Sequence, residues 1–313
     1  MNKVASIDIG SNTILLLVAE KKDTGFREIF SNSQIAGLGR GIDVIGNLSV
    51  EAQKDARLIL NEFCKILERE NIRPEEVICT ATEAARVAKN ACDFFNSIKA
   101  ELGFEVQIIN SECEAYFTAL GVASDSSTPV EFSILDVGGA STEIMRVKKN
   151  GDDIEMIRSI SLPVGSVRGS EWIKEKNFDL KIKKILNAHL DDYVTDQIIC
   201  VAGSMTSVAG IFHNLKIFEE KIIHKTKIST AHFAELIGKI EFLNEMELLQ
   251  KFPFLGKRAC TILAGAKVGI EIGKKIGIKS FGISTLGLRH GSLRYMLKRH
   301  TGRIDEHFIY RFC

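Results

Sequence analysis

Alternating apolar and polar positions divide the first 123 residues into five strands and three helices. Short runs rich in β-branched residues, with an apolar side chain at every second position, are typical of strands, and a period near 3.6 is typical of helices. Strands are predicted at residues 4–9, 13–19, 26–34, 77–80 and 104–109. Helices are predicted at about residues 48–70, 83–102 and 111–122, the last with Ser111 as its N-cap.

The same order of elements begins again after residues 123–129, which have the small and polar composition of a linker. Strands are predicted at residues 132–136, 143–147, 154–162, 198–202 and 280–283. Helices are predicted from about residues 164 and 180, at about 205–215, on either side of Pro253, and at about 256–276 and 288–300. The repeat favours a duplicated α/β domain with a cleft between the copies. We expect domains at residues 1–123 and 124–313, with residues 288–313 packing back on the first domain.

A short acidic motif follows the first strand of each predicted domain. Residues 6–11 read Ser-Ile-Asp-Ile-Gly-Ser, and residues 134–139 read Ile-Leu-Asp-Val-Gly-Gly. Asp8 and Asp136 each end a buried strand, where a carboxylate can hold a hard cation or its water shell. One Asp-x-Gly turn is usually only a turn, but two in matching positions indicate a binding role.

The residues around both aspartates suit phosphate. Gly10 has no side chain to block a phosphate group, and the N–H groups of the turn, with Ser11 and Asn12, can donate to phosphate oxygens. The second motif offers the same kind of loop from Gly138, Gly139, Ala140 and Ser141. It also adds a second carboxylate, that of Glu143.

The distribution of charge favours a polyanionic partner. The net charge is +1, but the charges are unevenly distributed along the chain. Residues 251–313 contain 13 Lys and Arg and three acidic residues, whereas the rest of the chain contains 28 Lys and Arg and 37 acidic residues. A basic segment on a neutral chain attracts polyanions, although a solvated helical face explains it equally well.

Other classes of protein are disfavoured. The 313 residues are 45% apolar and 26% charged, as is ordinary for globular proteins. The N-terminal segment lacks the basic, long apolar and small-residue regions that follow one another in a signal peptide. No run approaches the roughly 18 apolar residues of a membrane span. Seven scattered Cys without a Cys-x-x-Cys pair indicate idle thiols rather than a disulfide framework. One Trp and four Tyr offer little stacking surface for nucleic acid. We expect a soluble cytoplasmic protein without membrane or nucleic-acid partners, with a homodimer as the default assembly.

These motifs together make the chain resemble the exopolyphosphatase and guanosine pentaphosphate phosphohydrolase family of the actin, sugar-kinase and chaperone-ATPase superfamily. The acidic motifs at residues 8–12 and 136–143 are similar to the family's two phosphate loops. Further matching segments, in the family's order, are residues 37–49, 80–86, 109–115, 163–168 and 287–289. The resemblance implies a short-form member with an α/β fold of two actin-like (ribonuclease H-like) domains, in which mixed five-stranded sheets are flanked by helices.

The resemblance also implies roles for single residues. Glu114 matches the catalytic glutamate that positions or deprotonates the attacking water, with Glu112 as a neighbouring carboxylate that raises its pKa. Arg86 matches a residue that holds phosphate oxygens. Without the resemblance, Glu114 would be read as a carboxylate interacting with a helix dipole, and Arg86 as a solvent-facing residue. The cofactor Mg²⁺, with Mn²⁺ as the alternative, would be held by Asp8, Asp136 and Glu143.

Further phosphate contacts are expected in the second half of the chain. Gly203 and Ser204 follow a predicted strand at the place where the superfamily contacts a nucleotide or a distal phosphate. The basic residues expected to line the path of a phosphate chain are Lys257, Arg258, Lys267, Arg289 and Arg294. No more than half of them should do so, since many such charges simply face water.

Six residues depart from the family pattern, and two of them are Asn110 and Ser111, which replace a Ser-Gly pair. Ala140 replaces a loop glycine and is expected to lose a positive-φ position. Glu83 replaces a small hydroxyl residue, Tyr116 replaces a basic residue, and His290 replaces a glutamate. The acidic residues of the motifs remain, so we expect catalysis to be retained.

The sequence therefore favours a Mg²⁺-dependent exophosphatase that releases terminal phosphate from inorganic polyphosphate, guanosine pentaphosphate or both. Two alternatives stay open. One is a non-catalytic sensor that binds the alarmone or polyphosphate, which the departures at Ala140, Glu83 and His290 support. The other is a small-molecule kinase of the same superfamily, which needs an adenosine pocket and an acceptor site that no motif indicates.

Overall fold

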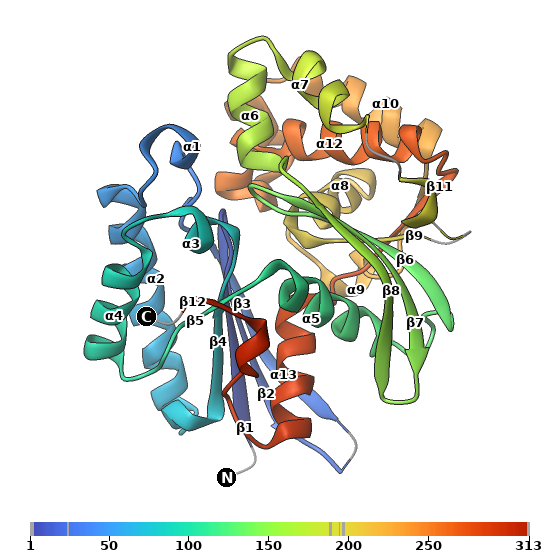
Figure 1. The fold of residues 1–313 in the computed structure, drawn as a ribbon. Helices are drawn as coiled ribbons and strands as arrows, with labels where there is room; N and C mark the ends of the chain where they lie inside the picture. The colour runs from blue at the N-terminus through green and yellow to red at the C-terminus, as the bar shows by residue number, and fades with distance from the viewer. Residues whose placement is uncertain (1–2, 24, 188–189, 194, 196–197, 312–313) are drawn as a thin grey trace. The chain divides into compact units, whose positions relative to one another are not determined.

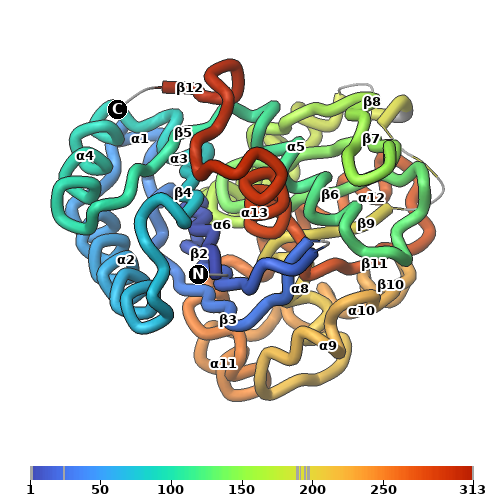
Figure 2. The backbone as a smooth tube through the Cα atoms, turned by 90° about the horizontal axis from the view of Figure 1, so that it is seen from below, coloured from blue at the N-terminus to red at the C-terminus, as the bar shows by residue number. Residues whose placement is uncertain are grey.

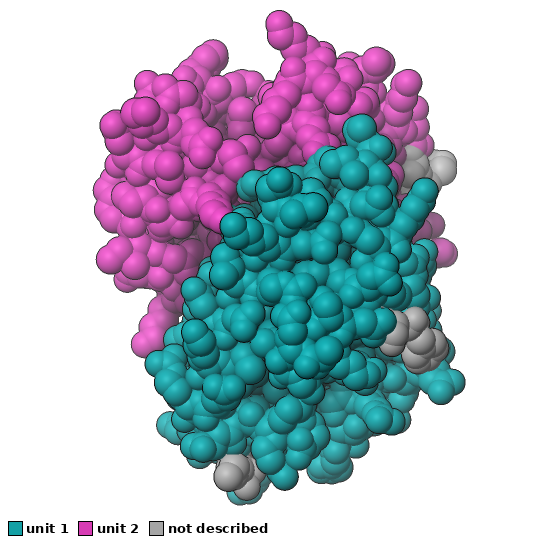
Figure 3. Space-filling view, turned by 90° about the vertical axis from the view of Figure 1, so that its left-hand side faces the viewer, with its two compact units in different colours: residues 1–125, 287–313 teal, residues 126–286 magenta. Residues whose placement is uncertain are grey.

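The computed structural model describes residues 3–23, 25–187, 190–193, 195 and 198–311. The chain forms two compact units, drawn in different colours in Figure 3. The first unit consists of Met1–Asp125 together with Gly287–Cys313, and the second of Ser126–Leu286. Residues from both ends of the sequence therefore build the first unit.

The first unit contains a six-stranded mixed sheet (Figure 1). Its strands, in spatial order, are β12 (Ile309–Arg311), β5 (Gln107–Ile109), β4 (Val77–Ala81), β1 (Lys3–Ile9), β2 (Thr13–Lys21) and β3 (Phe26–Ile35). The β1–β4 and β4–β5 pairs are parallel, and the others are antiparallel. β1 lies in the middle of the sheet, so both of its faces are covered and its sequence is a nearly continuous apolar run.

Helices cover both faces of this sheet. They are α1 (Ile42–Ile45), α2 (Val50–Arg69), α3 (Glu83–Val87), α4 (Ala91–Leu102), α5 (Ser111–Ala123) and α13 (Leu288–Arg299), with the 3₁₀ turns η1 (Pro74–Glu76) and η4 (Glu306–Phe308). Residues of α2 and α4 share one buried cluster with Ile7 of β1. On the opposite face, the Ser6 hydroxyl lies 2.8 Å from that of Ser292 on α13. Asp8 points to the same face as Ser6, because side chains two residues apart on a strand do so.

Helices α5 and α13 pack with their backbones in close contact. A Cβ atom at Gly121 would lie 2.2 Å from the carbonyl oxygen of Gly287, and one at Gly291 would lie 1.7 Å from that of Phe117. Real Cβ atoms essentially never come nearer than 3.0 Å. The absence of a side chain at these two glycines therefore sets the separation of the two helices.

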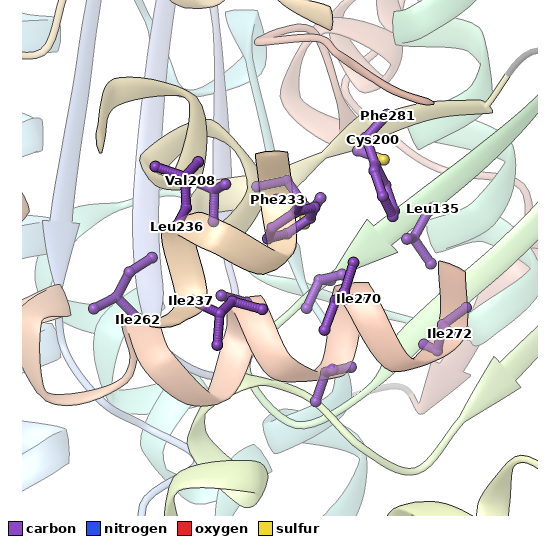
Figure 4. Packing of buried hydrophobic residues seen from close by; sticks show 14 of the residues in the cluster. Leu135, Cys200, Val208, Phe233, Leu236, Ile237, Ile262, Ile270, Ile272 and Phe281 are labelled. Atoms are coloured by element: carbon purple, nitrogen blue, oxygen red, sulfur yellow. The ribbon is translucent and has the colours of Figure 1, made fainter. Parts of the chain in front are cut away.

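The second unit repeats this architecture. Its strands, in spatial order, are β10 (Lys227–Ser229), β11 (Ser280–Ile283), β9 (Ile198–Val201), β6 (Glu131–Val137), β7 (Thr142–Asn150) and β8 (Asp153–Leu162). Its helices are α6 (Ser166–Lys174), α7 (Phe178–Ile185), α8 (Ala202–Phe212), α9 (Glu220–Ile223), α10 (Thr230–Glu241), α11 (Glu245–Lys251) and α12 (Ile262–Lys275), with the 3₁₀ segments η2 (Asp191–Tyr193) and η3 (Pro253–Cys260). In Figure 4, Ile270 of α12 and Phe233 of α10 lie in one buried cluster with Leu135 of β6.

The predicted α/β class and its two-sheet plan are confirmed, but each sheet has six strands rather than five. The additional strands, β10 and β12, are three-residue edge strands, too short to show a period in the sequence. The helix predicted at 83–102 is two helices, because the backbone becomes extended at Ala88, with a ψ of 130°. Asn90, between the helices, accepts from the Leu48 N–H at 2.8 Å and donates to the Leu48 carbonyl at 3.0 Å. The N-cap of α5 is Asn110 rather than Ser111.

Within the part of the chain that the structure describes, none of the helices combines the length and the apolar character that crossing a bilayer requires. The free thiols among the described cysteines are Cys64, Cys79, Cys113, Cys200 and Cys260. Cys92 is instead disulfide-bonded, so the expectation of idle thiols is wrong at this position.

Candidate active site

The first phosphate loop joins β1 to β2 and leaves backbone donors available. The Gly10 N–H donates to the Thr13 carbonyl at 3.0 Å and closes the turn. Between them, the N–H groups of Ser11 and Asn12 donate to no group of the described residues, although both residues are buried. Adjacent N–H groups of this kind form an anion-binding concavity. Of the three predicted phosphate contacts, Gly10 uses its N–H within the turn, and Ser11 and Asn12 have N–H groups available for a ligand.

Neighbouring segments fix this loop in place. The N–H groups of Ala36 and Gly37 both donate to the Asn12 carbonyl at 3.0 Å, and that of Gly39 donates to the Ser11 carbonyl at 2.7 Å. A Cβ atom at Gly39 would lie 2.9 Å from the Ser11 Cβ, so this close approach needs glycine. The glycine-rich segment that begins at residue 37 therefore acts as a support for the loop.

Glu114, at the start of α5, is a mostly buried carboxylate that forms an ion pair with one cation. Its side chain is 13% exposed, and its Oε2 lies 2.8 Å from Nη1 of Arg86 on α3. Arg86 also donates to the Glu83 carboxylate at 2.9 Å and to the Ile109 carbonyl at 3.0 Å. One buried guanidinium therefore joins two carboxylates and the end of β5.

The environment of Glu114 favours a proton acceptor. Burial raises the pKa of Glu114, Arg86 opposes this rise, and Glu83 adds to it. The net direction is upward, because the desolvation of a carboxylate outweighs one shared cation. The Arg86 guanidinium stays charged, since the two carboxylates raise its pKa against the opposing effect of burial.

This arrangement bears on two of the predicted roles. Arg86 contacts two carboxylates and a carbonyl and so holds Glu114 in place, and its contact with phosphate stays a prediction. Glu112 is exposed on the first turn of α5, and the neighbouring carboxylate that raises the pKa of Glu114 is Glu83. One signal of this role was visible in the sequence, because Glu83 is a charged residue at a position where the family has a small hydroxyl residue.

The second loop, between β6 and β7, closes with the same hydrogen bond as the first. The Gly138 N–H donates to the Ser141 carbonyl at 3.1 Å. The N–H groups of Gly139 and Ala140 donate to no described residue. Matching donors are thus available in this loop, where phosphate contacts were predicted.

The start of α6 anchors the second loop through its carbonyl groups. The Ser166 N–H donates to the Gly138 carbonyl at 2.9 Å, and Arg168 Nη1 donates to that of Ala140 at 2.5 Å. A Cβ atom at Gly165 would lie 2.6 Å from the Gly139 carbonyl carbon. These contacts explain why the segment at residues 163–168 contains a glycine and an arginine.

Two carboxylates beside the second loop form a cross-strand pair. Asp136 and Glu143 are directly opposite each other on β6 and β7. Glu143 is 3% exposed and accepts a hydrogen bond from the Ser161 hydroxyl at 2.8 Å. Two like charges in such a position repel each other, and oxygen ligands of this kind suit Mg²⁺. The donor set therefore fits the predicted cation, with Asp136 and Glu143 as its holders in this unit, and Asp8 lies in the other unit.

The predicted contact at Gly203 and Ser204 lies at the start of α8, together with Arg258. A Cβ atom at Gly203 would lie 2.8 Å from the Arg258 Nε, so the guanidinium lies directly on this glycine. The preceding residue, Ala202, has a φ of 69°, which is rare for a residue with a side chain.

The other predicted basic contacts are dispersed. Lys267 is paired with Glu241 of α10 at 2.5 Å, and Lys257 is exposed. Arg289 and Arg294 lie on α13, in the first unit. Among the described contacts of these residues, Arg258 is the one that lies against a predicted phosphate contact, Gly203, and the path of a phosphate chain stays a prediction.

The family assignment comes from comparison with known proteins. A model of the Ppx/GppA phosphatase family matches residues 17–300 of the chain. The chain belongs to the Ppx/GppA phosphatase family. Exopolyphosphatase 2 of Mycobacterium tuberculosis is 24% identical over 302 residues, which cover 88% of this chain and 91% of that protein. A bifunctional 3-dehydroquinate synthase/phosphatase of Fusobacterium nucleatum is 28% identical over 297 residues, which cover 86% of this chain but 42% of that protein. The chain thus spans less than half the length of the bifunctional relative.

Solved structures agree with this assignment. The Ppx/GppA family member of Aquifex aeolicus superimposes with a TM-score of 0.76 at 26% identity, covering 95% of this chain and 98% of that one. An exopolyphosphatase from Cytophaga hutchinsonii gives a TM-score of 0.81 at 23% identity, with 95% and 98% covered, and so shows the same fold.

The departures from the Ppx/GppA pattern have structural explanations. Ala140 is not among the residues with positive φ, so an alanine fits the backbone of this loop without strain. His290 is a capping residue, because its Nδ1 accepts from the Gly287 N–H at 3.3 Å, and its Nε2 lies 3.5 Å from a Glu28 carboxylate oxygen. Tyr116 stacks on Phe308 with ring centroids 5.5 Å apart. None of these three removes a donor of the phosphate loops.

Proposed function

We propose that this protein releases terminal phosphate from inorganic polyphosphate, guanosine pentaphosphate or both, in a Mg²⁺-dependent hydrolysis with Glu114 as the base. Its membership of a phosphatase family supports the reaction class. The observation that carries the proposal is Glu114 itself, a buried carboxylate with a raised pKa that is fixed by a single guanidinium. Burial of this kind favours proton uptake by a carboxylate, as a general base requires.

In this mechanism the residues of the chain bind phosphate, orient water and accept one proton. Backbone N–H groups of Ser11, Asn12, Gly139 and Ala140 donate to phosphoryl oxygens. Glu114 orients a water molecule and takes its proton as the water oxygen attacks the terminal phosphorus, and the bond from that phosphorus to the bridging oxygen breaks. Mg²⁺ held by Asp136 and Glu143, with Asp8 as the predicted third carboxylate, would supply positive charge that stabilises the transition state.

The test is phosphate release by the purified protein with Mg²⁺ on long-chain polyphosphate, short-chain polyphosphate and guanosine pentaphosphate in parallel. Glu114→Gln should lower kcat by about 10²- to 10⁴-fold, the usual contribution of a general base. Glu51→Gln is the matched control, since Glu51 is an exposed carboxylate in the first turn of α2. Full activity of folded Glu114→Gln would refute the mechanism. Tight binding of guanosine pentaphosphate without turnover by the wild type would instead favour the sensor.

A further inference from the structure

The segment that leads into β12 contacts the helix that carries Glu114. The Asn110 N–H donates to the Phe308 carbonyl at 2.9 Å, and Asn110 Nδ2 donates to the His307 carbonyl at 2.8 Å. The third group of Asn110, Oδ1, caps α5 by accepting from the Cys113 N–H at 2.8 Å. This segment therefore fixes the N-cap residue four positions before Glu114.

Strand β12 itself contacts α3, the helix that carries Arg86. Arg311 donates through Nη2 to the Arg86 carbonyl at 3.4 Å and through Nη1 to the Ala88 carbonyl at 3.3 Å. These carbonyls lie at the C-terminal end of α3, where a helix leaves its last acceptors without intrahelical partners. A cation at this end also interacts favourably with the helix dipole.

Helix α3 needs such support because it has five residues, Glu83–Val87. Helices of this length have no independent stability in water, so neighbouring groups decide their orientation. At its start, the Ala84 N–H donates to the Ser11 hydroxyl at 3.1 Å. At its end, Arg311 binds the carbonyl of the residue whose guanidinium holds Glu114.

The segment before β12 is itself firmly anchored in the first unit. Gln107 Nε2 donates to the Gly302 carbonyl at 2.7 Å, and Gln107 Oε1 accepts from the Ile304 N–H at 2.8 Å. Phe308 is 9% exposed and stacks on Tyr116 of α5. Figure 2 shows this red segment beside β5 and α13. Arg311 is thus attached to a fixed strand.

We propose that β12 positions the Arg86–Glu114 pair, with Arg311 as a positioning residue for the reaction. This inference rests on the proposed function, because it assigns a role relative to the base Glu114. Among the described contacts, Arg311 touches neither the Glu83 nor the Glu114 carboxylate, and it acts through the backbone of α3. Small misplacements of a base lower the rate of the chemical step more than they weaken substrate binding.

Steady-state kinetics on Arg311→Met, Arg311→Lys and Arg303→Met test the proposal. Arg303 is an exposed arginine of the same segment whose side chain makes no hydrogen bond or ion pair with the described residues, so its variant is the matched control. Arg311→Met should lower kcat about tenfold and change KM by less than about twofold. The loss is smaller than that expected for a fully misplaced base, because Arg311 acts on the base only indirectly. Arg311→Lys should recover part of the loss, and Arg303→Met should match the wild type.

A double variant separates positioning from general destabilisation. If Arg311 acts through Glu114, adding Arg311→Met to Glu114→Gln should lower the residual rate by less than about twofold, because coupled residues are not additive. A further tenfold loss, or equal effects of Arg311→Met and Arg303→Met, would overturn the proposal.

Amide hydrogen exchange tests the positioning role of Arg311 without any catalytic assay. Arg311→Met should speed amide exchange in residues 83–90 and 110–116, and Arg303→Met should not. Unchanged exchange there would overturn the positioning role even if the wild type were active. Absence of phosphate release by the wild type would refute the proposed function alone, and the exchange result would still decide whether Arg311 fixes these two segments.

Discussion

Replacing Gly291 by alanine tests the packing on which the position of Glu114 depends. Gly291 lies in α13, and its missing side chain lets this helix approach the backbone of α5. The added Cβ would lie 1.7 Å from the Phe117 carbonyl oxygen, whereas real Cβ contacts begin at 3.0 Å. The obstacle is backbone on both sides, so no side-chain rotation relieves it. The helices must separate by more than about 1 Å, which is the shortfall between those two distances.

The size of the effect follows from two opposing contributions. Alanine is favoured over glycine in a helix by about 1 kcal/mol. Overpacking a close contact usually costs about 1–3 kcal/mol, and more where the backbone itself must move, so about 4 kcal/mol is expected here. The net loss is therefore about 3 kcal/mol, which for a unit of this size lowers Tm by roughly 6–12 °C.

Thermal unfolding followed by circular dichroism measures this loss, with Gly238→Ala as the matched control. Gly238 also lies inside a helix, α10, but a Cβ atom there meets nothing within 4 Å. Gly238→Ala should raise stability by about 0.5–1 kcal/mol through helix propensity alone. An equal rise in Tm for Gly291→Ala and Gly238→Ala would show that α5 and α13 do not pack as described.

Three further outcomes are expected. Arg86→Met should destabilise the protein by about 3–5 kcal/mol, because it leaves buried carboxylates without their cation. The loss should be larger at pH 8 than at pH 5 in thermal unfolding. Without Arg86, whose charge lowers the pKa of Glu114, burial raises that pKa further, and a group with a raised folded pKa loses its stabilising effect as pH rises through it. Ala202→Gly should raise stability by about 0.5–1 kcal/mol in the same assay, because glycine adopts the φ of 69° without strain. Chelation of divalent cations should abolish phosphate release, and Asp136→Asn should raise the Mg²⁺ concentration needed for half-maximal rate.

The sequence was sufficient for the parts of the fold that depend on periodicity. The central strands β1 and β6 are apolar runs buried on both faces, and their predicted bounds agree with the structure to within one or two residues. The repeated motif also identified the two loops, because Asp8 and Asp136 occupy the same position in each sheet. Such features are local in sequence, so one chain without relatives reveals them.

Contacts between distant segments could not be predicted in this way. The Glu83–Arg86–Glu114 triad joins two helices through one guanidinium, and nothing in the pattern around residue 86 distinguishes a buried arginine from a solvated one. Strand β12 is three residues long and pairs with β5 about 200 residues earlier in the chain. The hydrogen bonds from Arg168 to the Ala140 carbonyl and from Ser161 to the Glu143 carboxylate likewise join residues that are distant in the sequence.

Comparison of the two loops indicates how duplicated units came to differ in chemistry. Both loops close with the same bond, from the glycine two residues after the aspartate to the carbonyl three residues further on. The position opposite the aspartate differs, since Asp8 faces Leu15 whereas Asp136 faces Glu143. A cross-strand carboxylate pair offers a cation oxygen ligands from two side chains, whereas the position opposite Asp8 offers none. The second unit therefore has the donor set that better suits the proposed cation, and the first contains the carboxylate proposed as the base.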